Sequence, residues 1–279
     1  MKRQKMYTSE NILSGKQNSN IADNLKNVKH RIIVMSGKGG VGKSTVATHL
    51  ASSLAHRGFQ VGLLDGDIHG PSVPKMYGIN AAATGEKRKG LDPFKVTDNL
   101  KIMSIELLVN SNDTPVIWRG PVKIRVIRQF LQDVKWGSLD FLIVDLPPGT
   151  GDEALTIAKF MPECDGVIIV TTPQEVALNS VIKSINFARS LKLPVLGLVE
   201  NMSSATCNIC HNRIDLFSSG AVVDTCKKYN IPLIARLPLE NEISRNADKG
   251  SVSSYAQKTS QWTECFRNIV DIVAEIDTR

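Results

Sequence analysis

One short string constrains the fold of this chain more than any other feature. Residues 37–44 read Gly-Lys-Gly-Gly-Val-Gly-Lys-Ser, which is a complete Gly-x4-Gly-Lys-Ser motif. The apolar run Ile32–Met35 precedes it, and apolar residues recur at helical spacing after it, from Val46 to Ala55. A glycine-rich loop between a buried strand and a helix is the context in which this motif binds phosphate. The sequence therefore predicts an α/β fold built around a phosphate-binding loop.

Each residue type in this loop has a chemical role in nucleotide binding. Glycines allow backbone N–H groups to close around a phosphate, and the N-terminus of the following helix adds positive potential. Lys43 is predicted to reach the β- and γ-phosphates as a catalytic residue, and the Ser44 hydroxyl to bind Mg²⁺. We therefore expect a P-loop NTPase with ATP and Mg²⁺ as its ligands. The expected nucleotide-binding residues of the loop are Gly37, Lys38, Gly39, Gly40, Val41, Gly42, Lys43, Ser44 and Thr45.

Short apolar strands and amphipathic helices alternate after the loop. The predicted strands are Val61–Leu64, Lys101–Ile105, Phe141–Val144, Val167–Val170, Val195–Val199 and Leu233–Leu237. This alternation predicts a mostly parallel sheet with helices on both faces. A surface loop is expected at residues 80–98, which are rich in glycine and charge, and a turn at Glu200–Ser203. Residues 31–279 are expected to form a single domain.

Residues 1–30 differ from the rest of the chain in charge. They contain six basic and two acidic side chains, so they account for +4 of the net charge of +7, and the remaining residues carry +3. We therefore expect a flexible basic tail in residues 1–30 and no nucleic-acid-binding face on the core. No apolar run approaches the roughly 20 residues that span a bilayer, so no membrane association is expected.

Three aspartates follow predicted strands where a nucleotide site needs carboxylates. Asp145 ends the strand Phe141–Val144, and there it is predicted to hold Mg²⁺ through water. The proline- and glycine-rich residues after it are typical of a switch loop that senses the γ-phosphate. Asp65 is expected to support the metal shell, and Asp67 to orient or activate the attacking water. Helix capping or a surface role is the alternative for Asp65 and Asp67.

The chain has five cysteines, an odd number, and its N-terminus lacks an apolar secretion signal. These features argue against a disulfide framework and for a reducing cytoplasmic location. Cys207 and Cys210 alone are spaced like metal or cluster ligands, in a loop expected near residues 203–220. A metal site normally needs four ligands, which one chain could complete with His211 and Cys226, and two chains with two identical pairs. A bridging iron–sulfur cluster, zinc and no metal are all open at this point.

The loop carries a second lysine, Lys38, directly after its first glycine. In this respect the chain resembles the deviant Walker A ATPases, a group that contains MinD, ParA, the nitrogenase iron protein and ArsA. In the proteins that it resembles, this lysine crosses a dimer interface and contacts the nucleotide of the partner. The resemblance therefore implies nucleotide-dependent homodimerisation, with Lys38 as a catalytic residue. An exposed lysine beside the phosphates is the alternative.

Longer strings are similar to one family within this group, the Mrp/ApbC iron–sulfur cluster carriers. The matching strings are residues 36–45, 65–72, 118–121 (Trp-Arg-Gly-Pro), 136–152, 172–178 and 200–203 (Glu-Asn-Met-Ser). The resemblance implies that Cys207 and Cys210 of each protomer jointly hold one bridging [4Fe–4S] cluster, which apo iron–sulfur proteins then receive. It also implies that Asn201 recognises adenine and that ATP hydrolysis is coupled to cluster loading or transfer.

The chain departs from the family pattern Cys-Pro-x-Cys-Gly at Asn208 and His211, which leaves both thiols in place. A spatial-organiser ATPase similar to MinD or ParA is the main alternative function, and an ATPase with a zinc-bound thiol loop is another. A MinD-like protein would need a basic amphipathic C-terminal helix, whereas residues 270–279 are acidic. A spatial organiser would also leave the cysteine pair unexplained, so we expect a carrier.

Overall fold

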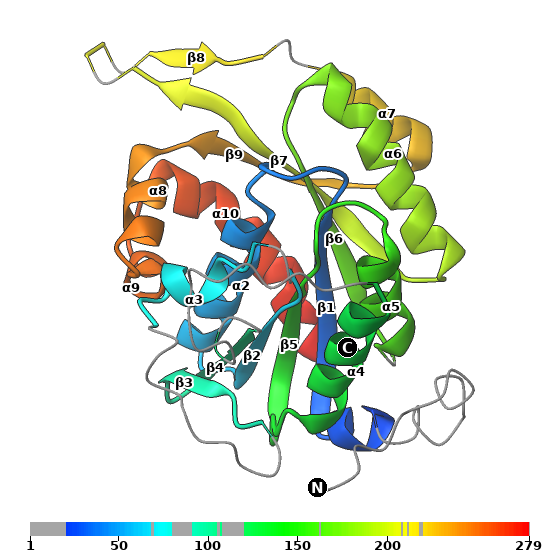
Figure 1. Ribbon diagram of the computed structural model, residues 1–279. Coiled ribbons are helices and arrows are strands. Elements are labelled where there is room, and N and C mark those ends of the chain that lie inside the picture. The colour runs from blue at the N-terminus through cyan, green and yellow to red at the C-terminus, as the bar shows by residue number, and fades with distance from the viewer. Residues whose placement is uncertain are drawn as a thin grey trace, which may run out of the picture.

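The computed structural model describes residues 21–67, 70–79, 91–104, 107, 120–161, 163–207, 209–210, 212–217 and 220–278. Within these ranges the parallel strands are β1 (Val28–Ser36), β2 (Val61–Asp65), β4 (Leu100–Ser104), β5 (Leu139–Asp145), β6 (Gly166–Thr171), β7 (Val195–Thr206) and β9 (Leu233–Leu239). Two further strands, β3 (Phe94–Thr97) and β8 (Arg213–Asp215), pair antiparallel with β4 and β7. The sheet runs in the order β3-β4-β2-β5-β1-β6-β7-β8, with β9 also on β7 (Figure 1). The predicted α/β fold with a mostly parallel sheet is confirmed.

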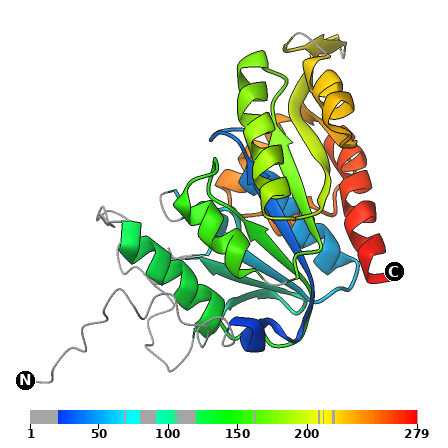
Figure 2. The ribbon, with the colours of Figure 1, turned by 90° about the vertical axis from the view of Figure 1, so that its right-hand side faces the viewer.

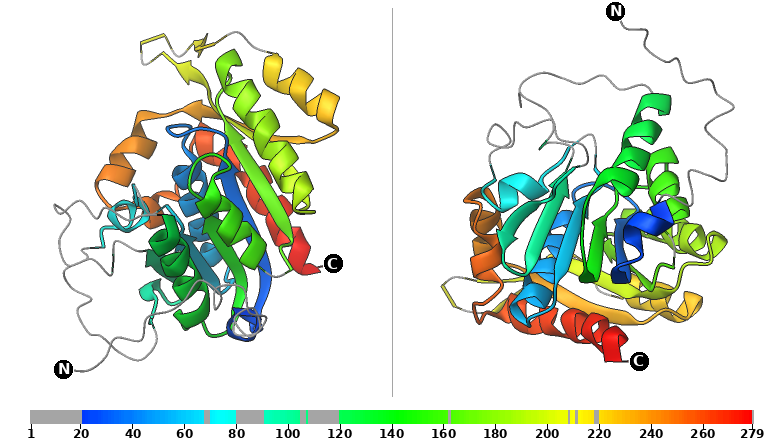
Figure 3. Two further views of the ribbon diagram at one scale, coloured as in Figure 1. Left: turned by 45° about the vertical axis from the view of Figure 1, so that its right-hand side comes forward. Right: turned by 90° about the horizontal axis from the view of Figure 1, so that it is seen from below.

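Helices cover both faces of this sheet, as the sequence predicts (Figures 2 and 3). One layer holds α2 (Lys43–His56), α3 (Val73–Met76), α8 (Asn241–Asp248), α9 (Val252–Tyr255) and α10 (Gln261–Ala274), and the other holds α4 (Gly120–Asp133), α5 (Asp152–Phe160), α6 (Glu175–Ser190) and α7 (Ala221–Tyr229). A short 3₁₀ helix, η4 (Glu275–Thr278), follows α10. In β1, Ile32 and Val34 face the first layer, whereas Ile33 and Met35 face the second. Because alternate residues of a strand point to opposite faces, one apolar run supplies both cores.

The carboxyl ends of the parallel strands lie along one edge of the sheet, and this edge carries the predicted site. In the pairing of β2 with β5, the register places Asp65 beside Asp145, the last residue of each strand. The loop of residues 37–44 leaves the end of β1, which is the next neighbour of β5. The strand order therefore brings together the phosphate-binding loop and the two aspartates, which are far apart in the sequence.

The folded part of the chain starts before the predicted boundary at residue 31. Residues 21–25 form a helical turn, and Ile21 and Leu25 are buried in the core beneath α4. Asn24 Nδ2 donates hydrogen bonds to the carbonyl oxygens of Leu131 and Val134, at 2.9 Å each. The prediction of a flexible tail is therefore wrong for residues 21–30, because their apolar side chains pack on the domain. The rest of the predicted tail lies outside the described residues.

Two local predictions also differ from the structure. The described part of the surface loop expected at residues 80–98 contains β3, in which Phe94 and Val96 alternate with polar residues; Phe94, Lys95 and Thr97 pair with β4, and the register shifts at Val96. The turn expected at Glu200–Ser203 is part of a strand, because β7 continues to Thr206. The backbone of β7 stays paired with β9 at Glu200 and Asn201, so these polar residues do not end the strand.

The buried position of Leu25 predicts a large loss of stability on truncation. Leu25→Ala should lower the free energy of unfolding by about 2–5 kcal/mol, since it removes a fully buried side chain from a packed core. Leu216→Ala is the control, because Leu216 is exposed and its truncation should cost less than about 1 kcal/mol. Urea unfolding of both variants measures the difference. Equal midpoints would show that residues 21–25 do not contribute to the core.

Candidate functional site

The phosphate-binding loop occupies the connection between β1 and α2, as predicted. Gly42 caps α2 with a φ of 84°, and Gly40 has a φ of 77°, both in the left-handed region that favours glycine. A Cβ atom on Gly42 would lie 2.2 Å from Asn201 Nδ2, so a side chain at this position would displace Asn201. The loop and the N-terminus of α2 together present backbone N–H groups in the arrangement that binds anions.

Lys43 is buried at the start of α2 and makes a direct contact with β5. Its Nζ donates to Asp145 Oδ1 at 2.5 Å, and it lies 3.3 Å from Ser44 Oγ. Buried charges occur mostly in pairs, because an isolated one loses its hydration without compensation. The three residues that the sequence predicts to meet the phosphates and the metal are therefore in contact with one another.

Asp145 has the surroundings of a metal ligand. Its Oδ2 is buried and has no hydrogen-bond partner within the described part of the chain, which is uncommon for a buried carboxylate. Burial raises the pKa of Asp145, while the Lys43 ammonium and the Ser44 hydroxyl oppose this shift. Carboxylate and hydroxyl oxygens are the ligands that Mg²⁺ prefers, and a cation would satisfy Oδ2. The residues present therefore fit the metal that the sequence predicts.

Asp65 and Asp67 lie at the same edge but make different contacts. The buried carboxylate of Asp65 accepts hydrogen bonds from the Asp67 N–H at 3.1 Å and from Ser104 Oγ at 3.2 Å. Burial raises the pKa of Asp65 to about 7, and the charge of Asp145 adds to the shift. Asp67 is half-buried and accepts from the Gly70 N–H at 3.2 Å. Asp65 thus organises the segment after β2, and the predicted roles of both residues in catalysis stay predictions.

Lys38 lies on the exposed side of the loop, where its Nζ donates to Gln174 Oε1 at 2.7 Å. Gln174 caps the N-terminus of α6, just beyond β6. Neither Gln174 nor Ser104 is predicted from the sequence to belong to the site. Both are polar residues at or just beyond the carboxyl ends of strands, Gln174 after β6 and Ser104 in β4. This position could have identified them as candidates from the sequence. The contact of Lys38 with a partner's nucleotide stays a prediction.

Asn201 lies inside β7 and is buried against the phosphate-binding loop. Its Nδ2 donates to the carbonyl oxygen of Val41 at 2.9 Å. The preceding residue, Glu200, forms an ion pair with Arg236 of β9 at 2.7 Å. The structure therefore places Asn201 against the phosphate-binding loop. Its recognition of adenine, which the family resemblance implies, stays a prediction.

Cys207 and Cys210 lie at the tip of the β7–β8 hairpin, which projects beyond the body of the sheet (Figure 1). The Cys207 N–H donates to the Asn212 carbonyl oxygen at 2.9 Å and closes the hairpin. Backbone hydrogen bonds from Cys210 and Ile209 lower the pKa of the Cys207 thiol, and the Cys210 side chain adds another hydrogen bond. The two thiols are therefore neighbours, and the hairpin favours the thiolate form that binds metals.

The other three cysteines do not join this pair. Cys226 is only 5% exposed, on the core side of α7, and burial raises its pKa. Cys164 and Cys265 pack against opposite cores, and burial raises the pKa of each. In the ranges that the structure describes, no three His, Cys, Asp or Glu side chains form a group that could hold a metal. The departures at Asn208 and His211 lie outside those ranges.

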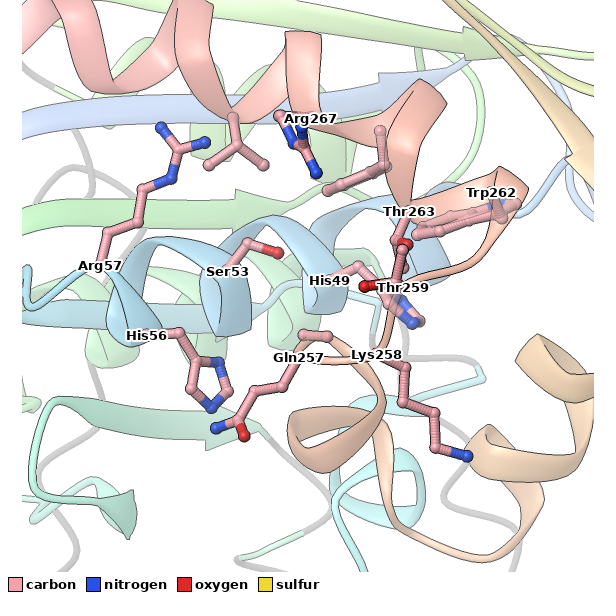
Figure 4. Close-up of a pocket in the computed structure, with 13 residues that line it drawn as sticks. His49, Ser53, His56, Arg57, Gln257, Lys258, Thr259, Trp262, Thr263 and Arg267 are labelled. Atoms are coloured by element: carbon pink, nitrogen blue, oxygen red, sulfur yellow. The ribbon is translucent and has the colours of Figure 1, made fainter.

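A separate groove of about 240 Å³ lies between α2, α10 and residues 256–259 (Figure 4). His49 of α2 lines it, with its Nδ1 2.8 Å from the Thr45 carbonyl oxygen and its ring 4.6 Å from that of Trp262. Burial lowers the pKa of His49 to about 4, so its ring is neutral at physiological pH. The groove lies away from the phosphate-binding loop, and its aromatic contacts hold α2 against α10.

Comparison with known proteins agrees with this geometry. A profile of the family described as ParA: NUBPL iron-transfer P-loop NTPase matches residues 27–274. An iron-sulfur cluster carrier protein of Methanocaldococcus jannaschii is 46% identical over 238 residues, which are 85% of this chain and 82% of that protein. A Brugia malayi protein named cytosolic Fe-S cluster assembly factor NUBP1 homolog is 44% identical, over 91% of this chain and 84% of that protein.

Solved structures share the fold. A nucleotide-binding protein from Archaeoglobus fulgidus, in complex with ADP, is 38% identical, with a TM-score of 0.76 over 89% of this chain and 96% of that one. The cell division ATPase MinD of Pyrococcus furiosus is 21% identical, with a TM-score of 0.64 over 89% of this chain and 100% of that one. The family profile spans nearly all the described residues, including the phosphate-binding loop, Asp145 and the thiol hairpin. The chain therefore belongs to the NUBPL iron-transfer P-loop NTPase family.

Proposed function

We propose that this chain is an ATP-hydrolysing carrier that binds a [4Fe–4S] cluster and transfers it to apo iron–sulfur proteins. One observation carries the proposal: Cys207 and Cys210 are held side by side on a hairpin of the sheet that also carries the phosphate-binding loop. The names of the relatives from Methanocaldococcus jannaschii and Brugia malayi support it. The cluster is the cargo of the protein, and ATP is its substrate.

The number of thiols favours a cluster shared between two chains. A [4Fe–4S] cluster is held by four cysteine thiolates, and each chain offers one adjacent pair, in which Cys210 is exposed and Cys207 partly exposed. A two-fold axis through the hairpin tip would bring two identical pairs together, so that each protomer supplies half of the ligands. The homodimer is therefore part of the proposed cluster site.

An apolar patch beside the thiols supports this arrangement. Within the described residues, the exposed large hydrophobic side chains are Ile209, Ile214, Leu216 and Leu239, and Ile209 is 91% exposed. Strand pairing places Ile214 and Leu239 on either side of Ala205, so the patch extends across β8, β7 and β9. Exposed apolar patches mark interaction surfaces. A second copy of the chain would cover this patch while it completes the ligand set.

Zinc held within one chain is the alternative occupant of the thiol pair. It would need further ligands from the same chain, for which the sequence offers Cys226 and His211. Cys226 faces the core from α7 and has a raised pKa, both of which disfavour metal binding. These observations favour the shared cluster.

ATP hydrolysis in this proposal uses the carboxyl edge of the sheet. Lys43 exchanges its contact with Asp145 for the β- and γ-phosphates, the usual partners of a P-loop lysine. Ser44 and Asp145 would hold Mg²⁺, which would neutralise phosphate charge, and Asp65 would support their geometry. Asp67 orients or activates the attacking water.

Two further residues adapt the site to ATP and to a dimer. Asn201 Nδ2 already donates to the Val41 carbonyl oxygen. We therefore assign Asn201 Oδ1 as the acceptor of a hydrogen bond from the amino group of adenine. Lys38 leaves Gln174 and reaches the nucleotide of the partner, so that hydrolysis depends on dimer formation. Through this dependence, hydrolysis would gate loading or release of the cluster.

A spatial organiser is the alternative for the whole chain, because MinD and ParA share its fold. Those structures are at most 21% identical to this chain, and the likeness supports the fold alone. None of the helices in the described ranges combines the length and apolar character needed to cross a bilayer. The relative named as a cytosolic assembly factor supports the cytoplasmic location proposed here.

Replacing the two loop lysines should separate nucleotide binding from dimer-dependent hydrolysis. Lys43→Ala should abolish turnover and sharply weaken ATP binding, because the phosphates lose their main cationic partner. Lys38→Ala should spare ATP binding by the monomer more than turnover. Calorimetric ATP titrations and phosphate-release assays measure both, and a thermal melt checks that the Lys43 variant is folded, since it leaves Asp145 unpaired. Turnover at the wild-type rate in Lys43→Ala would refute the ATPase proposal. Equal losses of ATP binding and of turnover in Lys38→Ala would contradict its role across the dimer interface.

The carboxylates of Asp67 and Asp145 should have different roles, the first toward the attacking water and the second toward the metal. Asp67→Asn should lower turnover while ATP affinity stays roughly intact, because the change removes a base or water-orienting group but keeps the shape. Asp145→Asn should instead raise the Mg²⁺ concentration needed for half-maximal turnover. Hydrolysis measured across a magnesium titration tests both variants, and identical titration curves would show that this assignment of roles is wrong.

Removal of either hairpin thiol should abolish the cluster. After anaerobic reconstitution with iron and sulfide, the wild type should hold about four irons per two chains, and Cys207→Ala or Cys210→Ala should hold none. Cys265→Ser and Cys164→Ala are controls that should load normally. Iron analysis and absorption spectra give the readout. One zinc per chain that is lost on Cys226→Ser, with no cluster after reconstitution, would refute the carrier proposal.

A further inference from the structure

We propose that Met202 is a strained coupling residue through which the phosphate-binding loop changes the exposure of the thiol pair. The inference concerns regulation of the site proposed above, and it rests on that proposed function. A single strand, β7, joins the two places (Figure 1). Asn201 on this strand contacts the loop, and Cys207 directly follows its last residue, Thr206. Cys207 lies six residues after Asn201, a span of at most roughly 20 Å, with no flexible linker between the two ends.

The loop end of this connection is a close and buried contact. Asn201 Nδ2 donates to the Val41 carbonyl oxygen at 2.9 Å, and both residues are almost fully buried. The amide also lies where a Cβ of Gly42 would be, 2.2 Å from that position. A change in the backbone at Val41 or Gly42 therefore acts directly on Asn201. Binding of phosphate reaches these same peptide groups, because the loop binds through its backbone N–H groups.

Strain in the backbone is located immediately after this contact. Met202 has a φ of 56°, in the left-handed region where the Cβ of an L-residue approaches a carbonyl oxygen. The other described residues with positive φ that are not glycine are Glu163, Lys192 and Asn230, and all three lie in turns. Met202 alone among these four lies inside a strand. Such a conformation persists only where neighbouring contacts hold it, and it is characteristic of switch regions and active sites.

The strand also changes its pairing at this residue. Asn201 is paired with Leu237 and Ala205 with Leu239, so four steps along β7 match two steps along β9. Ser203 Oγ donates to the Leu237 carbonyl oxygen at 3.0 Å and ties the bulge to β9. Bulges of this kind bend a strand and re-aim the side chains beyond it. Met202 thus lies at the junction between the part of β7 that pairs with both β6 and β9 and the part that forms the hairpin and keeps a single pairing with β9, Ala205 with Leu239.

Backbone pairing joins the two strands of the hairpin beyond the bulge into one unit. Ser204, Ala205 and Thr206 of β7 pair with Asp215, Ile214 and Arg213 of β8, and the Cys207 N–H closes the tip. A change of φ at Met202 therefore rotates the thiol pair together with its hydrogen bonds. In this mechanism the Val41–Asn201 contact is kept and carries a rearrangement of the loop on nucleotide binding to Met202, which then leaves its left-handed conformation. The nucleotide acts because it binds the two arrangements with different affinity.

The test is the reactivity of the thiols in the full chain, reduced and without a cluster. Rates of modification of Cys207 and Cys210 by N-ethylmaleimide are measured by peptide mass spectrometry, with Mg²⁺ alone, with ADP and with a non-hydrolysable ATP analogue. In the wild type the analogue should change these rates by at least about fivefold, the lower end of typical coupling between sites. The rate at buried Cys226 should stay constant, which shows that global unfolding does not cause the change.

Three variants separate backbone strain from other effects. Met202→Gly removes the cost of the left-handed conformation, so the rate ratio should fall below about twofold while nucleotide affinity is kept. Met202→Ala keeps the left-handed conformation without the longer side chain. Lys192→Gly relieves the same positive-φ strain in the turn between α6 and the start of β7, away from the bulge. Both variants should keep the wild-type ratio.

A wild-type ratio in Met202→Gly, or equal losses in the Ala and Gly variants, overturns the inference. A ratio near one in wild-type protein that still hydrolyses ATP and loads iron overturns the coupling alone. Failure of hydrolysis or of iron loading in the same preparation overturns the proposed function instead.

Discussion

The buried ion pair between Lys43 and Asp145 is the interaction on which the site depends. It ties the first turn of α2 to the end of β5 and so fixes the phosphate-binding loop over the carboxyl edge of the sheet. The register of β2 and β5 places Asp65 beside Asp145, and burial raises the pKa of both carboxyl groups. Two adjacent buried carboxyl groups need a cation nearby, and the lysine supplies it within the chain. A nucleotide with its metal ion would enter at the same place, where it competes for the same lysine.

The second constraint is the unusual length of β7. The strands β1, β2, β4, β5 and β6 end at the carboxyl edge, but β7 continues beyond Asn201, accompanied by the end of β9, and carries the thiol pair out of the nucleotide site. Separation of this kind keeps the thiols away from the phosphates, whose negative charge would oppose thiolate formation. It also makes one continuous strand the physical connection between the two sites. The fold thus places the contact with the phosphate-binding loop and the proposed cargo site on one strand.

The features that depend on neighbouring residues could be predicted from the sequence. The phosphate-binding loop, Asp145 at the end of an apolar strand and the spacing of Cys207 and Cys210 are local patterns with direct physical meaning. The parallel sheet followed from the alternation of strands and helices. Features that depend on tertiary contacts could not be predicted, among them the Lys38–Gln174 contact and the left-handed backbone of Met202. The packing of residues 21–30 also could not be predicted, because the segment is mostly polar. Its few apolar side chains are nevertheless spaced so that they reach the core.

The shortness of β8 has a consequence for how copies of this chain can assemble. It contributes three residues to the rim of the sheet, Arg213, Ile214 and Asp215, and the two charged side chains form an ion pair at 3.0 Å. Short edge strands that carry charge are poor templates for further strand addition. The apolar side chains at the hairpin can therefore meet a second hairpin without recruiting a third by backbone pairing. The exposed apolar side chains at the hairpin are therefore compatible with a dimer, while the short, charged edge strand opposes further growth into a fibre.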